Sequence, residues 1–133
     1  MKILYCAPEA TNPNHYAYGN IRASFLRLGL TVVDFDYLAE SAALGQAGMI
    51  AKLETLIVQE QPDLFYHAII EDELPVDFLE RLKANPAITT MVFFSDDDWR
   101  MPHSLQWVGH YDVATTNDID AMSLYRAHGH HHV

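Results

Sequence analysis

The stretch Thr90-Met91-Val92-Phe93-Phe94-Ser95-Asp96-Asp97-Asp98-Trp99 joins a short apolar run to three consecutive carboxylates. Residues 90–94 predict a strand buried on both faces, because continuous apolar runs are typical of strands in parallel sheets. Unpaired charges are costly inside a core, so the chain is expected to leave the sheet at Ser95 and to form an acidic loop. Ligands of open α/β sheets bind at the carboxyl ends of the strands. We therefore expect a binding site beside this segment.

The composition is that of a globular domain. A chain of 133 residues, of which 50% are hydrophobic and 20% charged, fits a single domain with a sizeable core. The formal net charge of −10 argues against nucleic acid as a partner. Cys6 is the single cysteine, so no internal disulfide is expected and a cytoplasmic location is the simplest interpretation. No apolar run approaches the ~18 residues that a membrane-spanning helix needs, so no membrane span is expected.

Strand patterns alternate with helical patterns along the whole chain. This alternation predicts an α/β fold, namely a Rossmann-like doubly wound sheet, mostly parallel, with helices on both faces. Five or six strands are expected. They cover residues 2–7, 30–35, 63–69, 90–94 and 113–115, with a sixth that could begin at residue 130.

The expected helices lie between these strands. The first begins near Asn20 and ends at Gly29, and its apolar residues are spaced for one buried face. This face comprises Ile21, Phe25 and Leu28. The later helices run from a cap at Ser41 to about residue 61, from Pro75 to residue 84, over residues 102–109, and from a cap at Asn117 or Asp118 to residue 128, where Gly129 ends the helix.

Polar and aromatic residues gather in the loops that follow strands one, three, four and five. Parallel strands bring these loops to one edge of the sheet. The residues are His15, Tyr16, Tyr18, Asn20, Glu71, Ser95, Asp96, Asp97, Asp98, Trp99, Arg100, His103, Thr115, Thr116 and Asn117. Carboxylates beside a tryptophan suit a carbohydrate, since they accept hydroxyl hydrogen bonds while the indole covers the apolar side of a sugar ring. The alternative is a solvated acidic loop with Trp99 packed in the core.

Metal and dinucleotide sites find less support in the sequence. Neighbouring side chains of an extended segment diverge, so at most two carboxylates of residues 96–98 could share an ion, and no metal is expected. The loop over residues 8–19 has one glycine and does not match the dinucleotide pattern, so no cofactor is expected. The histidines of residues 128–132 could bind zinc or nickel incidentally. Cys6 is interpreted as a small buried residue rather than a nucleophile.

A receiver domain of a two-component system has a similar length and alternation of elements. It requires an acidic pair after strand one, a phosphorylatable aspartate after strand three and a lysine after strand five. Here strand one ends in Ala7-Pro8-Glu9, strand three ends before Glu71, and no lysine follows Lys83. Phosphotransfer is therefore a poor fit, although a non-catalytic, receiver-like regulatory or protein-interaction domain remains the alternative.

Six short segments, spread over nearly the whole chain, carry a resemblance to a known protein family. The segments are Met1–Tyr5, Gly19–Val32, Gln61–Leu64, Phe94–Trp99, Tyr111–Asn117 and Leu124–Gly129. Together they resemble the amino-terminal domain of GT-B type glycosyltransferases, especially the bacterial proteins related to the spore maturation protein CgeB. The resemblance implies that the chain is the amino-terminal half of a longer two-domain protein and that a missing carboxyl-terminal domain binds the nucleotide sugar.

In such an enzyme the first domain shapes the acceptor side of the cleft, so the isolated domain is expected to be inactive. The partner implied is a carbohydrate or another hydroxyl acceptor, whose hydroxyl a base would orient or deprotonate. The candidates for this base are His15, Asp96, Asp97 and Asp98. Substrate binding is assigned to Tyr16, Tyr18, Asn20, Ser95, Trp99, Arg100 and Asn117. Exposed apolar surface near the carboxyl terminus could pair two copies of the domain as a homodimer.

Overall fold

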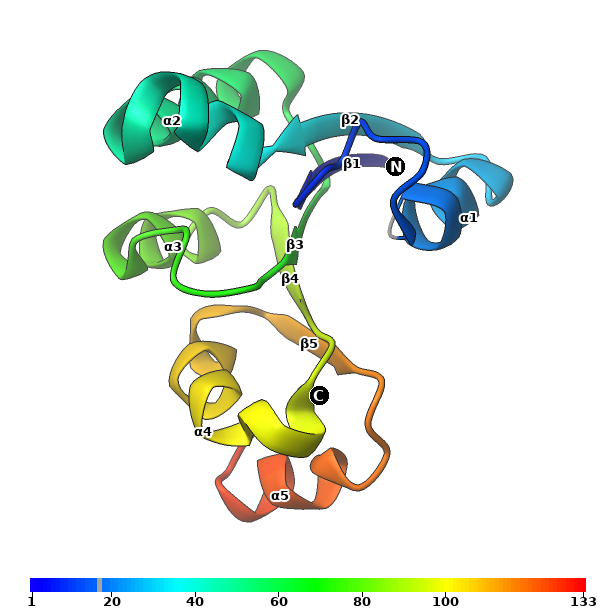
Figure 1. Ribbon diagram of the computed structural model, residues 1–133. Helices are drawn as coiled ribbons and strands as arrows, with labels where there is room; N and C mark the ends of the chain where they lie inside the picture. Colours follow the sequence, from blue (N-terminus) through cyan, green and yellow to red (C-terminus); the bar gives the residue numbers. More distant parts are fainter. Residues whose placement is uncertain (17) are drawn as a thin grey trace. The chain divides into compact units, whose positions relative to one another are not determined.

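The structure is a computed structural model, which describes residues 1–16 and 18–133. Its strands are β1 (Lys2–Ala7), β2 (Thr31–Asp36), β3 (Leu64–Ala68), β4 (Thr89–Phe94) and β5 (Val113–Thr116), in the order β2-β1-β3-β4-β5 (Figure 1). Helices alternate with these parallel strands, which confirms the predicted α/β, Rossmann-like fold. The chain divides into two compact units, Met1–His67 and Ala68–Val133. Among the described residues, no helix is both long enough and apolar enough to cross a membrane.

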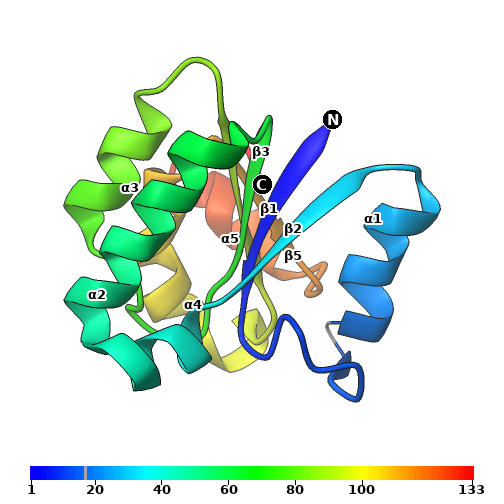
Figure 2. The same cartoon turned by 90° about the horizontal axis from the view of Figure 1, so that it is seen from above.

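In the first unit, β1 lies between β2 and β3 and is parallel to both. Residues 3–7 of β1 are completely buried, as expected for a central strand. A helix follows β1 and another follows β2, and Figure 2 shows α1 (Ala23–Arg27) and α2 (Tyr37–Glu60) on opposite sides of these strands. Right-handed crossovers explain this placement. The connection from β1 to β2 and the connection from β2 to β3 run in opposite directions along the sheet, so their helices lie on opposite faces.

The first helix differs from its prediction. A short π-helical segment, η1 (Tyr18–Arg22), precedes α1, so the expected single helix from Asn20 is divided into two pieces. Of the predicted buried face, Ile21 and Phe25 are half-buried. Leu28 lies at the C-cap, beyond the last residue of α1, and is 74% exposed rather than buried. The predicted stop is confirmed, because Gly29 has a left-handed φ of 76°.

The second helix begins earlier than expected. Asp36, not Ser41, caps α2, because its Oδ1 accepts a hydrogen bond of 3.1 Å from the amide of Ala39. Aspartate is as good a helix cap as serine. Because Asp36 is also the last residue of β2, no loop separates this strand from α2. Gly45 has a left-handed φ of 71° and kinks the helix. Met49 lies beyond the kink and is buried as predicted.

In the second unit, β4 pairs in parallel with β5, so that Phe94 lies opposite Thr116. The preceding helix, α3 (Val76–Lys83), buries Phe78, Leu79 and Leu82 as predicted. Burial alternates along β4, however. Thr90, Val92 and Phe94 are buried, whereas Met91 and Phe93 are only half-buried. The prediction of a strand completely buried on both faces was therefore wrong for one of them.

Two helices and the terminus of the second unit also differ from expectation. The helix α4 (Asp97–Trp107) begins five residues before Pro102, and the short η2 (Val108–His110) follows it. Asp120 occupies the cap position of α5 (Ala121–Ala127) without a side-chain bond, in place of Asn117 or Asp118. Gly129 is left-handed, as predicted, with a φ of 85°. Residues 130–133 form no sixth strand, although the His132 carbonyl accepts a hydrogen bond of 3.1 Å from Ala114 of β5.

His67 makes the stability of the protein depend on pH. This residue of β3 is completely buried beside the ring of Tyr37, and burial lowers its pKa from 6.5 to about 3. Between these two pKa values the histidine is protonated in the unfolded chain and neutral in the folded chain. The contribution of His67 to the free energy of unfolding is therefore fully present above pH 6.5. It decreases as the pH falls below this value, by up to about 1.4 kcal/mol per pH unit.

We expect urea unfolding between pH 6.5 and 5.0 to show this decrease. The variant His67→Gln should lose this contribution to the slope. The variant His131→Gln, which changes an exposed histidine, should retain it. Equal slopes in wild type and His67→Gln would contradict the assignment.

Candidate functional site

The acidic segment lies at the carboxyl end of β4, as predicted, but most of it is helical. Asp97 and Asp98 form the first turn of α4, and Asp96 precedes them at the cap position. Carboxylates are favourable there because the amino-terminal end of a helix carries a partial positive charge. Helical geometry then sends the three side chains in different directions. Asp96 is half-buried, Asp97 is buried and Asp98 is exposed.

Asp97 is part of the interior. Its side chain is 3% exposed, and its Oδ2 accepts a hydrogen bond of 2.8 Å from the hydroxyl of Tyr125 in α5. Its Oδ1 is also buried and has no hydrogen-bond partner among the described residues. Burial raises the pKa of the Tyr125 phenol, and the hydrogen bond to Asp97 raises that pKa further. The carboxylate therefore joins α4 to α5 and is not part of an open rim.

Trp99 points outward from the first turn of α4. Its side chain is 69% exposed, which contradicts the alternative in which it packs in the core. The Cζ atom of Arg100 lies 5.5 Å from the centre of the indole ring, within cation–π range. The sequence thus presents an aromatic face and a guanidinium side by side.

Arg100 is held in place from the loop that follows β3. Its Nη2 donates a hydrogen bond to the carbonyl of Ile70 and lies 3.3 Å from Oε1 of Glu71. The Arg100 side chain is only 15% exposed, whereas that of Glu71 is 68% exposed. The guanidinium is therefore fixed before any ligand arrives, while the carboxylate stays open to solvent.

These residues surround an open depression of about 380 Å³ on the second unit. It is lined by Glu71, Trp99, Arg100, Pro102 and His103. The indole offers an apolar surface, the guanidinium offers hydrogen-bond donors, and the Glu71 carboxylate offers acceptors. Such a set can bind a ring that is apolar on one face and carries hydroxyl groups at its edge.

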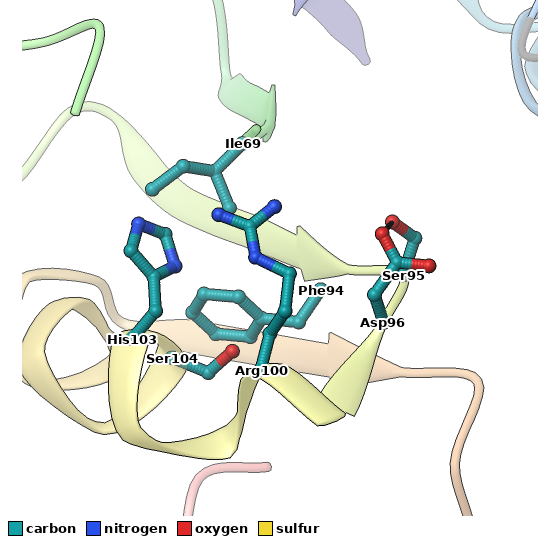
Figure 3. Close-up of a pocket in the computed structure, with 7 residues that line it drawn as sticks. All are labelled: Ile69, Phe94, Ser95, Asp96, Arg100, His103 and Ser104. Carbon is teal, nitrogen blue, oxygen red and sulfur yellow. Dashed lines mark hydrogen bonds between the residues drawn. The ribbon is translucent and has the colours of Figure 1, made fainter. Parts of the chain in front are cut away.

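A smaller pocket lies at the end of β4 and is shown in Figure 3. Its volume of about 10 Å³ is close to the smallest that can hold one water molecule. Figure 3 shows the Arg100 side chain extending between His103 on one side and the Ser95 and Asp96 pair on the other. The Ser95 hydroxyl donates a hydrogen bond of 3.0 Å to Oδ2 of Asp96. The pocket is lined by Ile69, Phe94, Ser95, Asp96, Arg100, His103 and Ser104.

The predicted residues of the first loop form a group of their own in the first unit. The rings of His15 and Tyr16 lie 4.7 Å apart, and Tyr16 is 59% exposed. The ring of Tyr18 covers the guanidinium of Arg22 at 4.6 Å, and Arg22 binds both carboxylate oxygens of Asp34 at 2.6 and 2.7 Å. Asn20 is exposed within η1. The predicted convergence of this loop with the acidic segment stays a prediction.

Thr115 and Thr116, at the carboxyl end of β5, and Asn117, which follows the strand, line neither pocket described above. The Thr115 hydroxyl donates to the carbonyl of Val92 at 3.1 Å, and Thr116 Oγ1 accepts from the amide of Asp118 at 3.0 Å. Both hydroxyls thus have bonds that stabilise the strand and the turn after it. Asn117 is exposed beside them.

Ile69, Pro102 and Ser104 were not predicted as site residues. For Ser104 the signal was present in the helical spacing, because Arg100, His103 and Ser104 share one face of a helix at i, i+3 and i+4. Placing the helix start at Pro102 concealed this relation. A start at Asp97 would have revealed it.

No metal centre is found among the residues that the structure describes. None of their His, Cys, Asp and Glu side chains are arranged in a group of three or more that could hold an ion. In the histidine tract, His132 Nε2 instead lies 3.1 Å from the carbonyl oxygen of Val108, within hydrogen-bond distance.

Comparisons with known proteins do not assign a family. No family model, curated protein or solved structure matches this chain. One α/β architecture serves many functions, so the function of this chain has to be inferred from the chemistry of the site.

Proposed function

We propose that the depression beside α4 binds a carbohydrate or a similar polyhydroxylated ligand. The observation that carries this proposal is the 69% exposure of Trp99 next to Arg100. An exposed indole face leaves apolar area in contact with water, and covering it with the C–H face of a sugar ring would remove that cost.

The polar groups complement the hydroxyls of such a ligand. Arg100 is already positioned by the Ile70 carbonyl and by Glu71, so little side-chain freedom is lost when it donates to a hydroxyl. The Glu71 carboxylate is 68% exposed and can accept hydroxyl hydrogen bonds.

We further propose that the chain acts as the acceptor-side domain of a GT-B type glycosyltransferase. The location of the depression supports this role, because it adjoins the carboxyl end of β4, where α/β proteins bind ligands. A carboxyl-terminal domain would then bind the nucleotide sugar. Among the candidate bases, Asp97 is the least suitable because it is buried, whereas Asp96 lines the smaller pocket. His15 and the exposed Asp98 complete the set.

Titration with simple glycosides tests the proposed site. We expect methyl glucoside, galactoside or mannoside to shift the indole N–H resonance of Trp99 in an NMR spectrum, with a dissociation constant in roughly the millimolar range for so small a ligand. The indole of Trp107, which lines neither pocket, serves as the internal control. A Trp99 resonance that does not move with any of the three glycosides would refute the carbohydrate site.

A second titration tests the division of roles between two domains. Nucleotide sugars should bind this chain no more tightly than the free glycosides do. Tight binding of a nucleotide sugar by this chain alone would show that the donor site lies here, which would contradict the acceptor-side role.

A further inference from the structure

The smaller pocket adjoins the depression through shared residues. Arg100 and His103 line both of them. A ring that rests on Trp99 and bonds to Arg100 therefore presents one of its substituents to the smaller pocket. Since that pocket has a volume of about 10 Å³, it admits one group the size of a hydroxyl.

The charges around the two pockets oppose an anionic ligand. Asp96 lines the smaller pocket and Glu71 lines the depression. Arg100 lies between them, and the pairing of its Nη2 with Glu71 offsets the charge of that carboxylate, so that the charge of Asp96 is left without a paired cation among the described residues. The Asp96 carboxylate accepts a hydrogen bond from Ser95 and can accept another from a ligand hydroxyl. A ligand carboxylate in the same place would meet like charge.

We infer that the two pockets together select neutral sugars with an unsubstituted hydroxyl at the ring position that faces Asp96. This inference rests on the proposed carbohydrate site and adds a specificity to it. Uronic acids bind more weakly because their charge is repelled by Asp96, and sugars substituted at that position are excluded by size. Asp96 and Ser95 are the residues that determine this choice.

Paired glycosides provide the first test. We expect methyl glucuronide, galacturonide and mannuronide to bind roughly tenfold more weakly than the corresponding neutral glycosides, because of like-charge repulsion at short range. The variant Asp96→Asn should reduce this difference to about threefold. The matched control is Asp98→Asn, which removes the same charge from an exposed carboxylate that lines neither pocket and should leave the difference unchanged.

A set of mono-O-methyl ethers of the neutral glycoside that binds provides the second test. We expect methylation at one ring position to abolish binding, and Ser95→Gly, which enlarges the pocket, to restore part of it. Circular dichroism confirms that each variant is folded. Asp96 makes no side-chain cap bond to α4, so its amide variant is expected to fold.

Each outcome has a distinct meaning. If no glycoside shifts Trp99, the proposed function fails and the specificity fails with it. If neutral glycosides bind but the uronides bind equally well, only the specificity is overturned. Equal effects of Asp96→Asn and Asp98→Asn would show that net charge, and not the smaller pocket, controls the choice. Tolerance of every methyl ether would overturn the size argument.

Discussion

Replacing Tyr125 with phenylalanine is expected to lower the free energy of unfolding by about 2–4 kcal/mol. The tyrosine is completely buried, and its hydroxyl bonds at 2.8 Å to a carboxylate that is 3% exposed. The ring itself is conserved in the variant, so little packing is lost. The cost arises because the buried Asp97 carboxylate would lose the hydrogen bond to its Oδ2, while its Oδ1 already has no hydrogen-bond partner among the described residues. Urea denaturation at pH 7 measures the change.

Two further variants make this prediction specific. Tyr16→Phe removes the same hydroxyl from a side chain that is 59% exposed, and its effect should stay within about 0.5 kcal/mol. In an Asp97→Asn background, Tyr125→Phe should cost only about 1 kcal/mol, because a neutral amide is less costly to leave unbonded. If Tyr125→Phe lowers the free energy of unfolding no more than Tyr16→Phe does, the hydrogen bond to Asp97 contributes no net stability.

Replacing Trp99 with alanine is expected to weaken glycoside binding by about 1–2 kcal/mol, or five- to thirtyfold. The indole supplies the apolar face of the depression. His103 is the one other aromatic residue among those that line it. Because Trp99 is 69% exposed, the same change should alter stability by no more than about 0.5 kcal/mol. Isothermal titration calorimetry and urea denaturation separate the two effects.

The matched control is Ile119→Ala, which removes a side chain that is 83% exposed and lines neither pocket. It should leave binding unchanged. Trp99→Phe keeps a smaller aromatic face and should fall between wild type and alanine. Unaltered glycoside affinity in Trp99→Ala would remove the observation on which the proposed function rests.

The sequence was sufficient for the order of the elements. Short apolar runs such as residues 90–94 can be recognised as strands from local sequence alone, even though only one face of this strand is completely buried. The left-handed stops at Gly29 and Gly129 were also predictable, since glycine adopts positive φ without steric cost. The start of α4 was not, because Pro102 favoured a helix start at that point although it lies inside the helix.

The site was predicted less completely than the fold. The abrupt change of polarity after a strand predicted Ser95, Trp99 and Arg100 as binding residues and Asp96 as a candidate base. All four line a pocket. The contribution of Glu71 to the depression depends on its ion pair with Arg100, which lies 29 residues further along the chain. An ion pair between residues so far apart in the sequence cannot be predicted from local sequence patterns.

The amino-acid sequence by itself thus determined the α/β alternation and the location of an acidic, aromatic segment at the end of β4. Only the tertiary structure decided what each carboxylate does there. A strand and a helix impose different directions on consecutive side chains, so the helical start at Asp97 buried one aspartate against Tyr125, placed Asp96 in the smaller pocket and left Asp98 in solvent. The exposed Trp99 follows from the same helical turn.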